Sequence, residues 1–395
     1  MNRFILTNAR IVTPTQDFTG SLVIEDGIIA DIQPDSSYAE GIDLHGQWLV
    51  PGCIDIHSDY LEKELHPRPS ADFPMPFAFH FMDQRAAACG LTTLFSAISF
   101  SDNQMVNRSY ESALERAHAL DTLQDTGMIR HFIHARLDPN AERVVDYLDA
   151  MKAIPSLRLV VINESIPGQR QFRLADLIVK RAKSQQISIE ESERMLRAQI
   201  AERSRVDKRA EIQTALAEVL PLGSHDDTTE THVAEAKQFG ATLSEMPTTL
   251  AAAQKAKELG LWVCMGAPNY VRGGSHCGNL SCHEAMAEGL VDMLCSDYHF
   301  PTMLASVIRM MQEGVSPSQA VNYITKNPAE FLGMQQTGVI AVGKQADLVA
   351  FWEDQQVAKV SRVWVDGKLK FQTDPSGINE AFGKISSADS LPQEH

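Results

Sequence analysis

The chain has 395 residues, of which 44% are hydrophobic and 22% charged, and its formal net charge at pH 7 is −16. This length allows one large domain with a smaller addition. The negative charge argues against wrapping nucleic acid, whose phosphates require a basic face. The sequence has no apolar run of about 18 residues, so we expect no membrane span. The start, MNRFILTNARIVTP, lacks the features of a secretory leader.

The six cysteines are scattered through the chain without a paired spacing. Such a pattern is typical of reduced thiols rather than of a disulfide framework, so we expect a cytoplasmic protein. We also expect a homo-oligomer, with neither nucleic acid nor a membrane as partner.

Short β-type segments separated by polar turns occupy residues 1–50, where EDGIIADI carries an Asp-Gly hairpin signal between apolar runs. Residues 337–372 return to the same pattern, again with Asp-Gly in a turn. We therefore expect these two segments to pair into one small β-sandwich domain. Residues 373–395 are polar and without an apolar period, which predicts a loose C-terminal tail.

The middle of the chain, residues 51–336, alternates apolar strands with helical stretches. This alternation favours an α/β fold of the (β/α)8 TIM-barrel type, with a doubly wound open sheet as the competing topology. The charged stretch 173–218 is too long for one crossover helix and predicts a helical insertion near the fourth strand. The candidate strands are 52–57, 91–99, 129–137, 157–165, 219–226, 241–247, 261–268 and 291–297.

Metal-ligand side chains recur where these strands end, which is the edge at which such barrels place their active sites. Imidazole and carboxylate together suit a divalent ion such as Zn²⁺ or Mn²⁺, and we expect one or two of them. Such an ion lowers the pKa of bound water, and we expect Asp297 to take the proton as the catalytic base. The predicted metal ligands are His57, Asp59, Glu164, His225 and Asp297.

Each of these residues also has a structural interpretation. His57 could be a buried histidine held by hydrogen bonds, Glu164 could cap a loop, and Asp297 could stabilise a turn. Asp226 and Asp227 could cap the helix predicted through TTETHVAEAKQFG. Their joint placement at strand ends favours the metal site.

Three loops, residues 62–70, 167–173 and 269–279, each combine Arg or Lys with Pro or Gly. Gly-rich turns let backbone N–H groups approach an anion, and Arg binds phosphate oxygens with two parallel donors. The alternative is that these arginines are ordinary solvated charges. Since all three loops would lie over the barrel mouth, we expect them to bind phosphate. The predicted substrate-binding residues, from these loops and from the end of the sixth strand, are Lys63, Arg68, Gln169, Arg170, Arg173, Glu245, Asn269, Arg272, Gly273, Gly274, Ser275 and His276.

Two segments of the sequence resemble the amidohydrolase superfamily. They are LVPGCIDIH, after the β-rich start, and NPAEFLGMQQTGVIAVGKQADLVAF, near the end. This resemblance implies a barrel between the halves of a small β domain, and one or two divalent metals that activate water.

Within that superfamily, the chain resembles the diphosphatases of the carbon–phosphorus lyase pathway. The motifs that carry this closer resemblance are HSDYLEKELHPRPSADFP, PGQRQF, SHDDTTETHVAEA, SEMPTT and MGAPNYVRGGSHCGN. The closer resemblance implies cleavage of α-D-ribose 1-methylphosphonate 5-triphosphate to the 5-phosphate and pyrophosphate. It places His57, Asp59, His225 and Asp297 at metal-ligand positions and residues 272–276 in an anion loop.

Two positions depart from the pattern of that family. The family usually has Arg-x-Glu on the third strand, where this chain has His134-Ala135-Arg136. It usually has Asp-His before PGQRQF, where this chain has Glu164-Ser165. Arg136 would bring a cation close to the expected metals, where it would replace one ion electrostatically or meet a different anionic group of the substrate.

The sequence thus favours a metal-dependent phosphoanhydride hydrolase of phosphonate catabolism. Two alternatives stay open: a hydrolase of C–N bonds that acts on a cyclic amide or by deamination, and a catalytically silent paralogue that binds a phosphorylated ligand.

Overall fold

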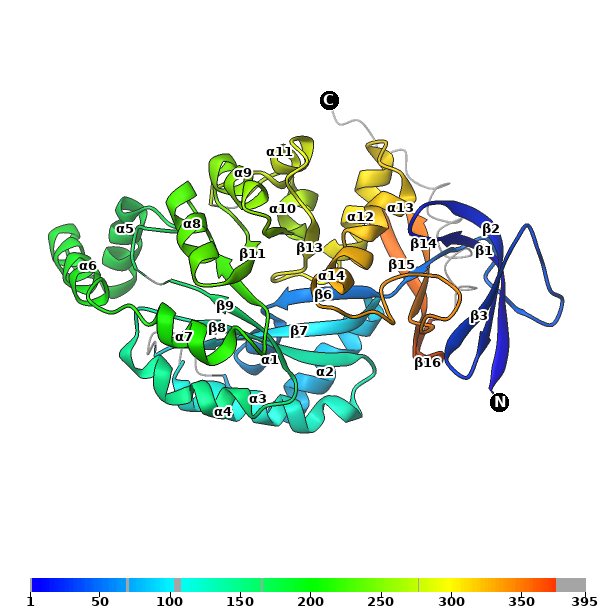
Figure 1. Ribbon diagram of the computed structural model, residues 1–395, viewed down its shortest axis with the longest axis horizontal. Coiled ribbons are helices and arrows are strands. Elements are labelled where there is room, and N and C mark those ends of the chain that lie inside the picture. The colour runs from blue at the N-terminus through cyan, green and yellow to red at the C-terminus, as the bar shows by residue number, and fades with distance from the viewer. Residues whose placement is uncertain (1, 69–70, 103–107, 165, 276, 374–395) are drawn as a thin grey trace, which may run out of the picture.

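The computed structural model describes residues 2–68, 71–102, 108–164, 166–275 and 277–373. Two eight-stranded sheets form the framework. One is a parallel barrel surrounded by helices, and the other is a mixed sheet at one end of the molecule, made from both ends of the chain (Figure 1). This arrangement confirms the predicted fold class. Within the described residues, no helix combines the length and the apolar character needed to span a bilayer.

The barrel strands follow one another in chain order, and each pairs in parallel with the next. A bridge between Ser58 and Asp297 joins the last strand region to the first, and the Asp297 N–H donates to the carbonyl of His57 over 3.0 Å. This closure excludes the doubly wound open sheet. All eight predicted strands are present: β6 (Cys53–Ser58), β7 (Leu91–Phe100), β8 (Arg130–Leu137), β9 (Leu157–Ile162), β10 (Leu222–His225), β11 (Ala241–Glu245), β12 (Trp262–Gly266) and β13 (Met293–Cys295).

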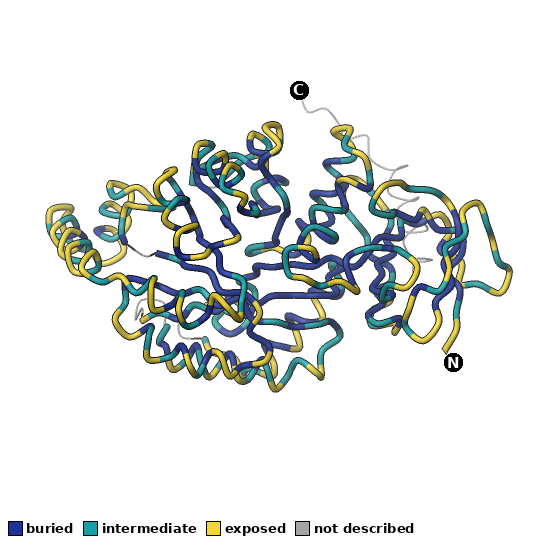
Figure 2. The backbone as a smooth tube through the Cα atoms, in the orientation of Figure 1, coloured by how far each residue is buried: buried dark blue, intermediate teal, exposed yellow. Residues whose placement is uncertain are grey.

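The barrel strands are buried along most of their length, whereas the outer faces of the helices are exposed (Figure 2). Strands covered by helices on one side and by the barrel interior on the other are buried at nearly every position, and in CIDIHS and LTTLFSAISF even the polar residues are largely buried. The polar residues within these runs are therefore the informative ones.

The helices that surround the barrel bury one apolar face each. In α12, for example, Met303, Val307 and Met310 recur at helical spacing and are buried. The helices outside the 173–218 stretch are α1 (Tyr60–Leu65), α2 (Met75–Ala88), α3 (Tyr110–Leu123), α4 (Leu148–Lys152), α8 (Glu230–Gln238), α9 (Leu250–Glu258), α10 (Ala267–Arg272), α11 (Cys282–Ala287), α12 (Thr302–Gln312), α13 (Pro317–Asn322) and α14 (Lys326–Phe331), with short 3₁₀ turns at η2 (Gln124–Thr126) and η3 (Glu142–Tyr147).

Between β9 and β10 the chain forms α5 (Leu174–Gln185), α6 (Ile189–Arg203) and α7 (Arg209–Leu216), in the stretch where the sequence predicts a helical insertion. The first two pack on each other, and the Ser192 hydroxyl on α6 donates to the carbonyl of Ile178 on α5 over 2.8 Å. They extend beyond the barrel at the end opposite the terminal sheet (Figure 1).

The terminal sheet joins the two ends of the chain through antiparallel pairing of β5 with β14. The sheet has two Asp-Gly turns. In the first, φ is 49° at Asp26 and 86° at Gly27; in the second, φ is 51° at Asp366 and 68° at Gly367. Positive φ at both positions is what a type I′ hairpin requires, so the predicted Asp-Gly hairpins are confirmed. The strands are β1 (Arg3–Val12), β2 (Asp17–Glu25), β3 (Ile28–Pro34), β4 (Ile42–Asp43), β5 (Trp48–Pro51), β14 (Leu348–Asp354), β15 (Val357–Val365) and β16 (Lys368–Gln372).

One arginine ties this sheet to the barrel. Arg130, at the start of β8, forms ion pairs with Asp347 and Asp366 of the terminal sheet. All six cysteines lie in the described residues and are free. Apart from Thr373, the predicted tail at 373–395 lies outside the described residues.

Candidate metal centre

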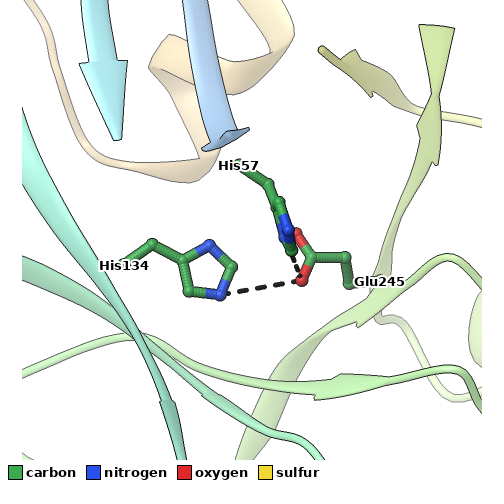
Figure 3. A group of neighbouring side chains, drawn as sticks. All are labelled: His57, His134 and Glu245. Carbon is green, nitrogen blue, oxygen red and sulfur yellow. Dashed lines mark ion pairs between the residues drawn. The ribbon is translucent and has the colours of Figure 1, made fainter. Parts of the chain in front are cut away.

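Three strands of the barrel bring His57, His134 and Glu245 together at the carboxyl ends of the strands (Figure 3). The Oε2 atom of Glu245 lies 3.0 Å from His57 Nδ1 and 3.7 Å from His134 Nε2. It also lies 3.7 Å from Nε2 of His225, at the end of β10. One buried carboxylate oxygen therefore faces three imidazole rings.

These contacts do not satisfy the atoms that make them. Among the described residues, His57 Nδ1, His134 Nε2 and both carboxylate oxygens of Glu245 are buried without a hydrogen-bond partner. Leaving such a group unpaired costs roughly 1–3 kcal/mol, so each case requires an explanation. A divalent transition ion bound by imidazole nitrogen and carboxylate oxygen would satisfy all of them, and the ligand atoms lie within 4.8 Å of one another. The residues present therefore fit a metal ion.

His134 is held in the tautomer that such a site needs. Its Nδ1 lies 2.9 Å from the carbonyl oxygen of Ile56, which only accepts hydrogen bonds, so Nδ1 carries the proton. Burial lowers the pKa of His134 to about 3, which keeps the ring neutral. Its Nε2 lone pair therefore points at Glu245, an orientation that a backbone contact commonly imposes on a metal ligand.

His225 contacts a carboxylate through each ring nitrogen. Its Nδ1 lies 2.9 Å from Asp226 Oδ2 without forming a hydrogen bond, and its Nε2 lies 3.7 Å from Glu245 Oε2. Burial alone would raise the pKa of Glu245, but the imidazoles of His57 and His134 outweigh this effect and lower that pKa to about 2. Glu245 is thus an ionised carboxylate in a site that requires positive charge.

A second group of candidate ligands lies beside the first and consists of His57, Asp59 and Asp297. His57 Nε2 is 3.7 Å from Asp59 Oδ1, and the same oxygen is 3.0 Å from Arg136 Nη2. Burial would raise the pKa of Asp59, but Arg136 holds it well below its usual range. Burial raises the pKa of Asp297, which makes that carboxylate the better proton acceptor of the two.

The backbone at the barrel rim is strained where the candidate ligands are presented. Asp226, Met246 and Asp297 follow the ends of their strands and have φ values of 57°, 54° and 53°. Left-handed φ is unfavourable for residues other than glycine and tends to persist at functional sites. Rim hydrogen bonds hold these turns in place, such as those from the Asp226 N–H to the Glu245 carbonyl (2.9 Å) and from the Asp297 N–H to the His57 carbonyl (3.0 Å).

Comparison with known proteins identifies the family. The amidohydrolase family pattern matches residues 275–370. The α-D-ribose 1-methylphosphonate 5-triphosphate diphosphatase of Escherichia coli strain K12 is 33% identical over 377 residues, which cover 93% of this chain and 100% of that protein. The chain belongs to the amidohydrolase family. It is therefore a hydrolytic enzyme, and members of this family typically use divalent metals.

Solved structures of amidohydrolases share the fold. N-acetylglucosamine-6-phosphate deacetylase from Pasteurella multocida superimposes with a TM-score of 0.61 at 13% identity, over 94% of this chain and 100% of that one. A D-hydantoinase superimposes with a TM-score of 0.58 at 16% identity, over 93% and 95% of the two chains. At these identities the similarity shows the fold alone.

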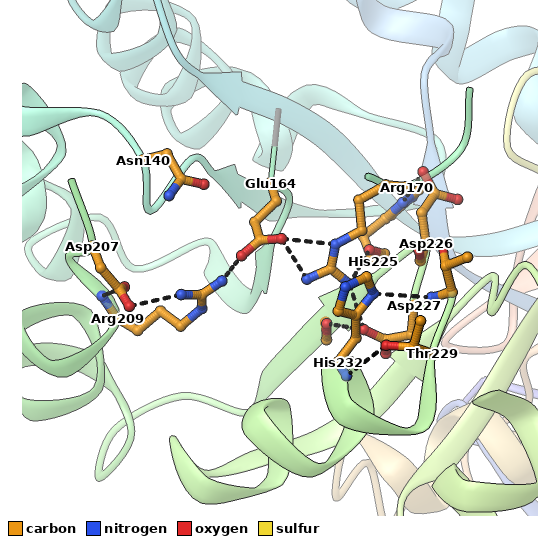
Figure 4. A network of polar contacts seen from close by, with 12 residues as sticks. Asn140, Glu164, Arg170, Asp207, Arg209, His225, Asp226, Asp227, Thr229 and His232 are labelled. Carbon is orange, nitrogen blue, oxygen red and sulfur yellow. Dashed lines mark hydrogen bonds and ion pairs between the residues drawn. The ribbon is translucent and has the colours of Figure 1, made fainter. Parts of the chain in front are cut away.

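The predicted ligand Glu164 has a different environment in this amidohydrolase (Figure 4). It forms ion pairs with Arg170 and Arg209, and Arg170 Nη2 lies 2.7 Å from its Oε2. Both carboxylate oxygens therefore already face guanidinium groups. Among the described residues, Glu164 does not fall in any of the groups whose ligand atoms converge.

Arg170 also holds the loop after β10. Its Nη1 donates to Asp227 Oδ1 over 2.6 Å, and Asp227 also accepts from the hydroxyls of Ser224 (2.7 Å) and Ser244 (2.8 Å). The N-cap of α8 is Thr229, whose side chain accepts from the backbone N–H three residues on. The alternative that Asp226 or Asp227 caps this helix is therefore wrong; Asp227 instead fixes Arg170.

Two of the cavities at the barrel mouth of this amidohydrolase contain Asp297. The larger has a volume of about 490 Å³, and four arginines and four carboxylates line it, so their formal charges cancel. The smaller has a volume of about 60 Å³ and is lined by Asn269, Arg272, Gly274 and Ser275 from the predicted anion loop. Asp297 lines both. The charged residues of the larger cavity are Arg108, Arg136, Arg170, Arg181, Asp59, Glu164, Asp226 and Asp297.

Other predicted substrate-binding residues lie further out. Lys63 donates to the carbonyl of Tyr298 over 3.3 Å, and Arg68 is exposed. Arg173 is 87% exposed and pairs with Asp176 on the same helical turn. The remaining ones are Gln169, exposed on its loop, Gly273, with φ of 81° at the end of α10, and His276, which lies outside the described residues.

Sequence reasoning did not predict His134 as a ligand and assigned Glu245 to the substrate. The signal available was the spacing between His134 and Arg136, because residues two apart on a strand share a face. If Arg136 faces the metals, as the sequence suggested, His134 faces them too.

Proposed function

We propose that this enzyme hydrolyses α-D-ribose 1-methylphosphonate 5-triphosphate to the 5-phosphate and pyrophosphate. The observation that supports a metal-dependent hydrolase most strongly is the ionised, buried Glu245 facing three imidazoles at the barrel mouth. The substrate is inferred from the relative in E. coli, whose name states that activity and which this chain matches over its full length.

The residues that would hold a divalent ion, Zn²⁺ or Mn²⁺, are His57, His134, His225 and Glu245. Such an ion lowers the pKa of water and polarises a phosphoryl oxygen. Asp297, whose pKa is raised by burial, would accept the proton of the attacking water and return it to the leaving oxygen. Glu164 is left out of the ligand set because two arginines already pair with it.

Both cavities would be needed for a substrate with anionic groups at each end. The larger cavity would take the ribose and its phosphonate, near Arg108 and Arg136. The smaller would take the pyrophosphate, beside Asn269 and Arg272. Because the fixed charges of the larger cavity cancel, the attraction for a polyanion would depend on the bound ion, which links binding as well as catalysis to the metal.

The experiment is a pyrophosphate-release assay with the purified protein, loaded with Mn²⁺ or Zn²⁺ and given the ribosyl triphosphate. We expect one pyrophosphate per substrate, no release after treatment with a chelator, and recovery when the ion is restored. The variant Asp297→Asn should lose about a thousand-fold in kcat/KM, the range over which a positioned base and its charge act.

Failure to release pyrophosphate from the ribosyl triphosphate with the metal restored would refute the proposal. A parallel screen of cyclic amides and amino-substituted heterocycles tests the alternative of C–N hydrolysis. The expected homo-oligomer stays a prediction.

A further inference from the structure

The two groups of candidate ligands share His57. Its Nδ1 faces Glu245 at 3.0 Å, in the group with His134, while its Nε2 faces Asp59 at 3.7 Å, in the group with Asp297. A neutral imidazole has one nitrogen with a free lone pair and one that carries a proton. His57 can therefore ligate an ion in one group while it donates a hydrogen bond in the other.

The second group already contains a cation. Arg136 Nη2 lies 3.0 Å from Asp59 Oδ1, and the Arg136 side chain is only 10% exposed. A guanidinium is permanently charged and offers donors that match a carboxylate. Asp59 therefore has an ion-pair partner in the protein, although its Oδ1 and Arg136 Nη2 form no hydrogen bond, whereas among the described residues the ion-pair partners of Glu245 are imidazoles alone.

Glu164 is also unavailable to bridge two ions. Glu164 is the remaining predicted ligand, and its oxygens face Arg170 and Arg209. A second divalent ion beside Asp59 would also lie close to Arg136 and be repelled by it.

We propose that this centre binds a single divalent ion, in the group of His134 and Glu245, and that Arg136 acts as the fixed second cation of the site. The ion is held by His134, Glu245 and imidazole nitrogens of His57 and His225. Arg136 is then a positioning residue, because it holds Asp59 beside the ion without binding the ion itself. The inference relies on the proposed function only in that a metal is bound, and it is independent of the substrate.

The test is the metal stoichiometry of the full-length protein. The apoprotein is titrated with Mn²⁺ while free Mn²⁺ is followed by electron paramagnetic resonance, and the bound metal is measured by elemental analysis after dialysis. We expect the wild type to saturate at about one ion per chain, because Arg136 already supplies the positive charge beside Asp59.

Three variants sharpen the measurement. Arg136→Met removes the guanidinium and should allow a second, weaker ion at Asp59 and Asp297, whereas Arg136→Lys keeps a positive charge and should stay at one ion. Arg158→Met is the matched control, because it makes the same change at an exposed position on β9. It should also stay at one ion.

Two ions per wild-type chain, with dissociation constants within about tenfold of each other, would overturn the proposal. The proposal would also be overturned if folded Arg136→Met bound only one ion per chain, or if the wild type bound no ion. If Arg136→Met does not fold, the wild-type stoichiometry decides alone. A chain that binds one ion but releases no pyrophosphate would refute the proposed substrate and leave this inference standing.

Discussion

Two buried carboxylates of the barrel, Glu245 and Asp227, have opposite surroundings. Both side chains are fully buried. Asp227 accepts hydrogen bonds from Arg170 (Figure 4) and from the hydroxyls of Ser224 and Ser244. Neither oxygen of Glu245 has a hydrogen-bond partner in the described residues, although the imidazoles of His57 and His134 (Figure 3) and that of His225 face it.

The difference shows how a structural acid can be told from a functional one. Burying an ionised carboxylate is unfavourable unless donors or cations compensate for it. The chain supplies that compensation to Asp227 from its own side chains, so this acid fixes a loop. It surrounds Glu245 with imidazoles, which are themselves common metal ligands, and this environment supports the proposed ion.

The largest effect is expected from Glu245→Gln, which removes the charge and keeps the shape. The variant should lose the bound metal and about a thousand-fold or more in kcat/KM, because the ion supplies the activated water. Elemental analysis and the pyrophosphate assay measure the two losses. Glu235→Gln on the exposed face of α8 is the control and should match the wild type. Full metal content in Glu245→Gln would show that the carboxylate is not a ligand.

The barrel and the terminal sheet that position these two acids could be predicted from the sequence, because their strands and hairpins depend on local patterns. Each apolar run bounded by turns became a barrel strand, and the Asp-Gly pairs became hairpins. Joint placement of His57, His225 and Asp297 at strand ends followed from the rule that the carboxyl ends of parallel strands share an edge. The prediction of where the active site would lie therefore needed no knowledge of side-chain directions.

What could not be predicted was which residue on each strand faces which partner. Strands buried on both sides do not alternate regularly in polarity, so the pattern of β8 alone did not reveal its inward face, and His134 could be placed only through its spacing from Arg136. The pairing of Glu164 with Arg209 joins residues 45 positions apart across the inserted helices, a separation that no local pattern encodes.

For Asp227 the expected effect is on stability. Asp227→Asn would leave the buried Arg170 without this charge partner and should lower the free energy of unfolding by about 3 kcal/mol. Urea unfolding followed by circular dichroism measures it. Asp176→Asn, in an exposed pair, should change stability by less than about 0.5 kcal/mol. If the two substitutions lowered the free energy of unfolding equally, Asp227 would contribute no more to stability than an exposed acid does.

Removal of the metal should have a smaller effect on stability. An ion present at a hundred times its dissociation constant stabilises the folded state by about 2.7 kcal/mol, so a chelator should lower the Tm of the wild type. The chelator should leave the Tm of His134→Ala nearly unchanged, because that variant has lost a ligand. A chelator effect of the same size in both would place the ion elsewhere.

The smallest effect is expected at Arg173, which the sequence predicted to bind substrate and which lies 87% exposed beside Asp176. An exposed pair of this kind contributes little, so Arg173→Ala should change stability by less than about 0.5 kcal/mol and kcat/KM by less than about twofold. Arg272→Ala, in the small cavity beside Asp297, should instead raise KM for the triphosphate. If both variants raised KM alike, the phosphates would have to reach beyond the cavities to the outer loop, and the separation of inner and outer arginines would fail.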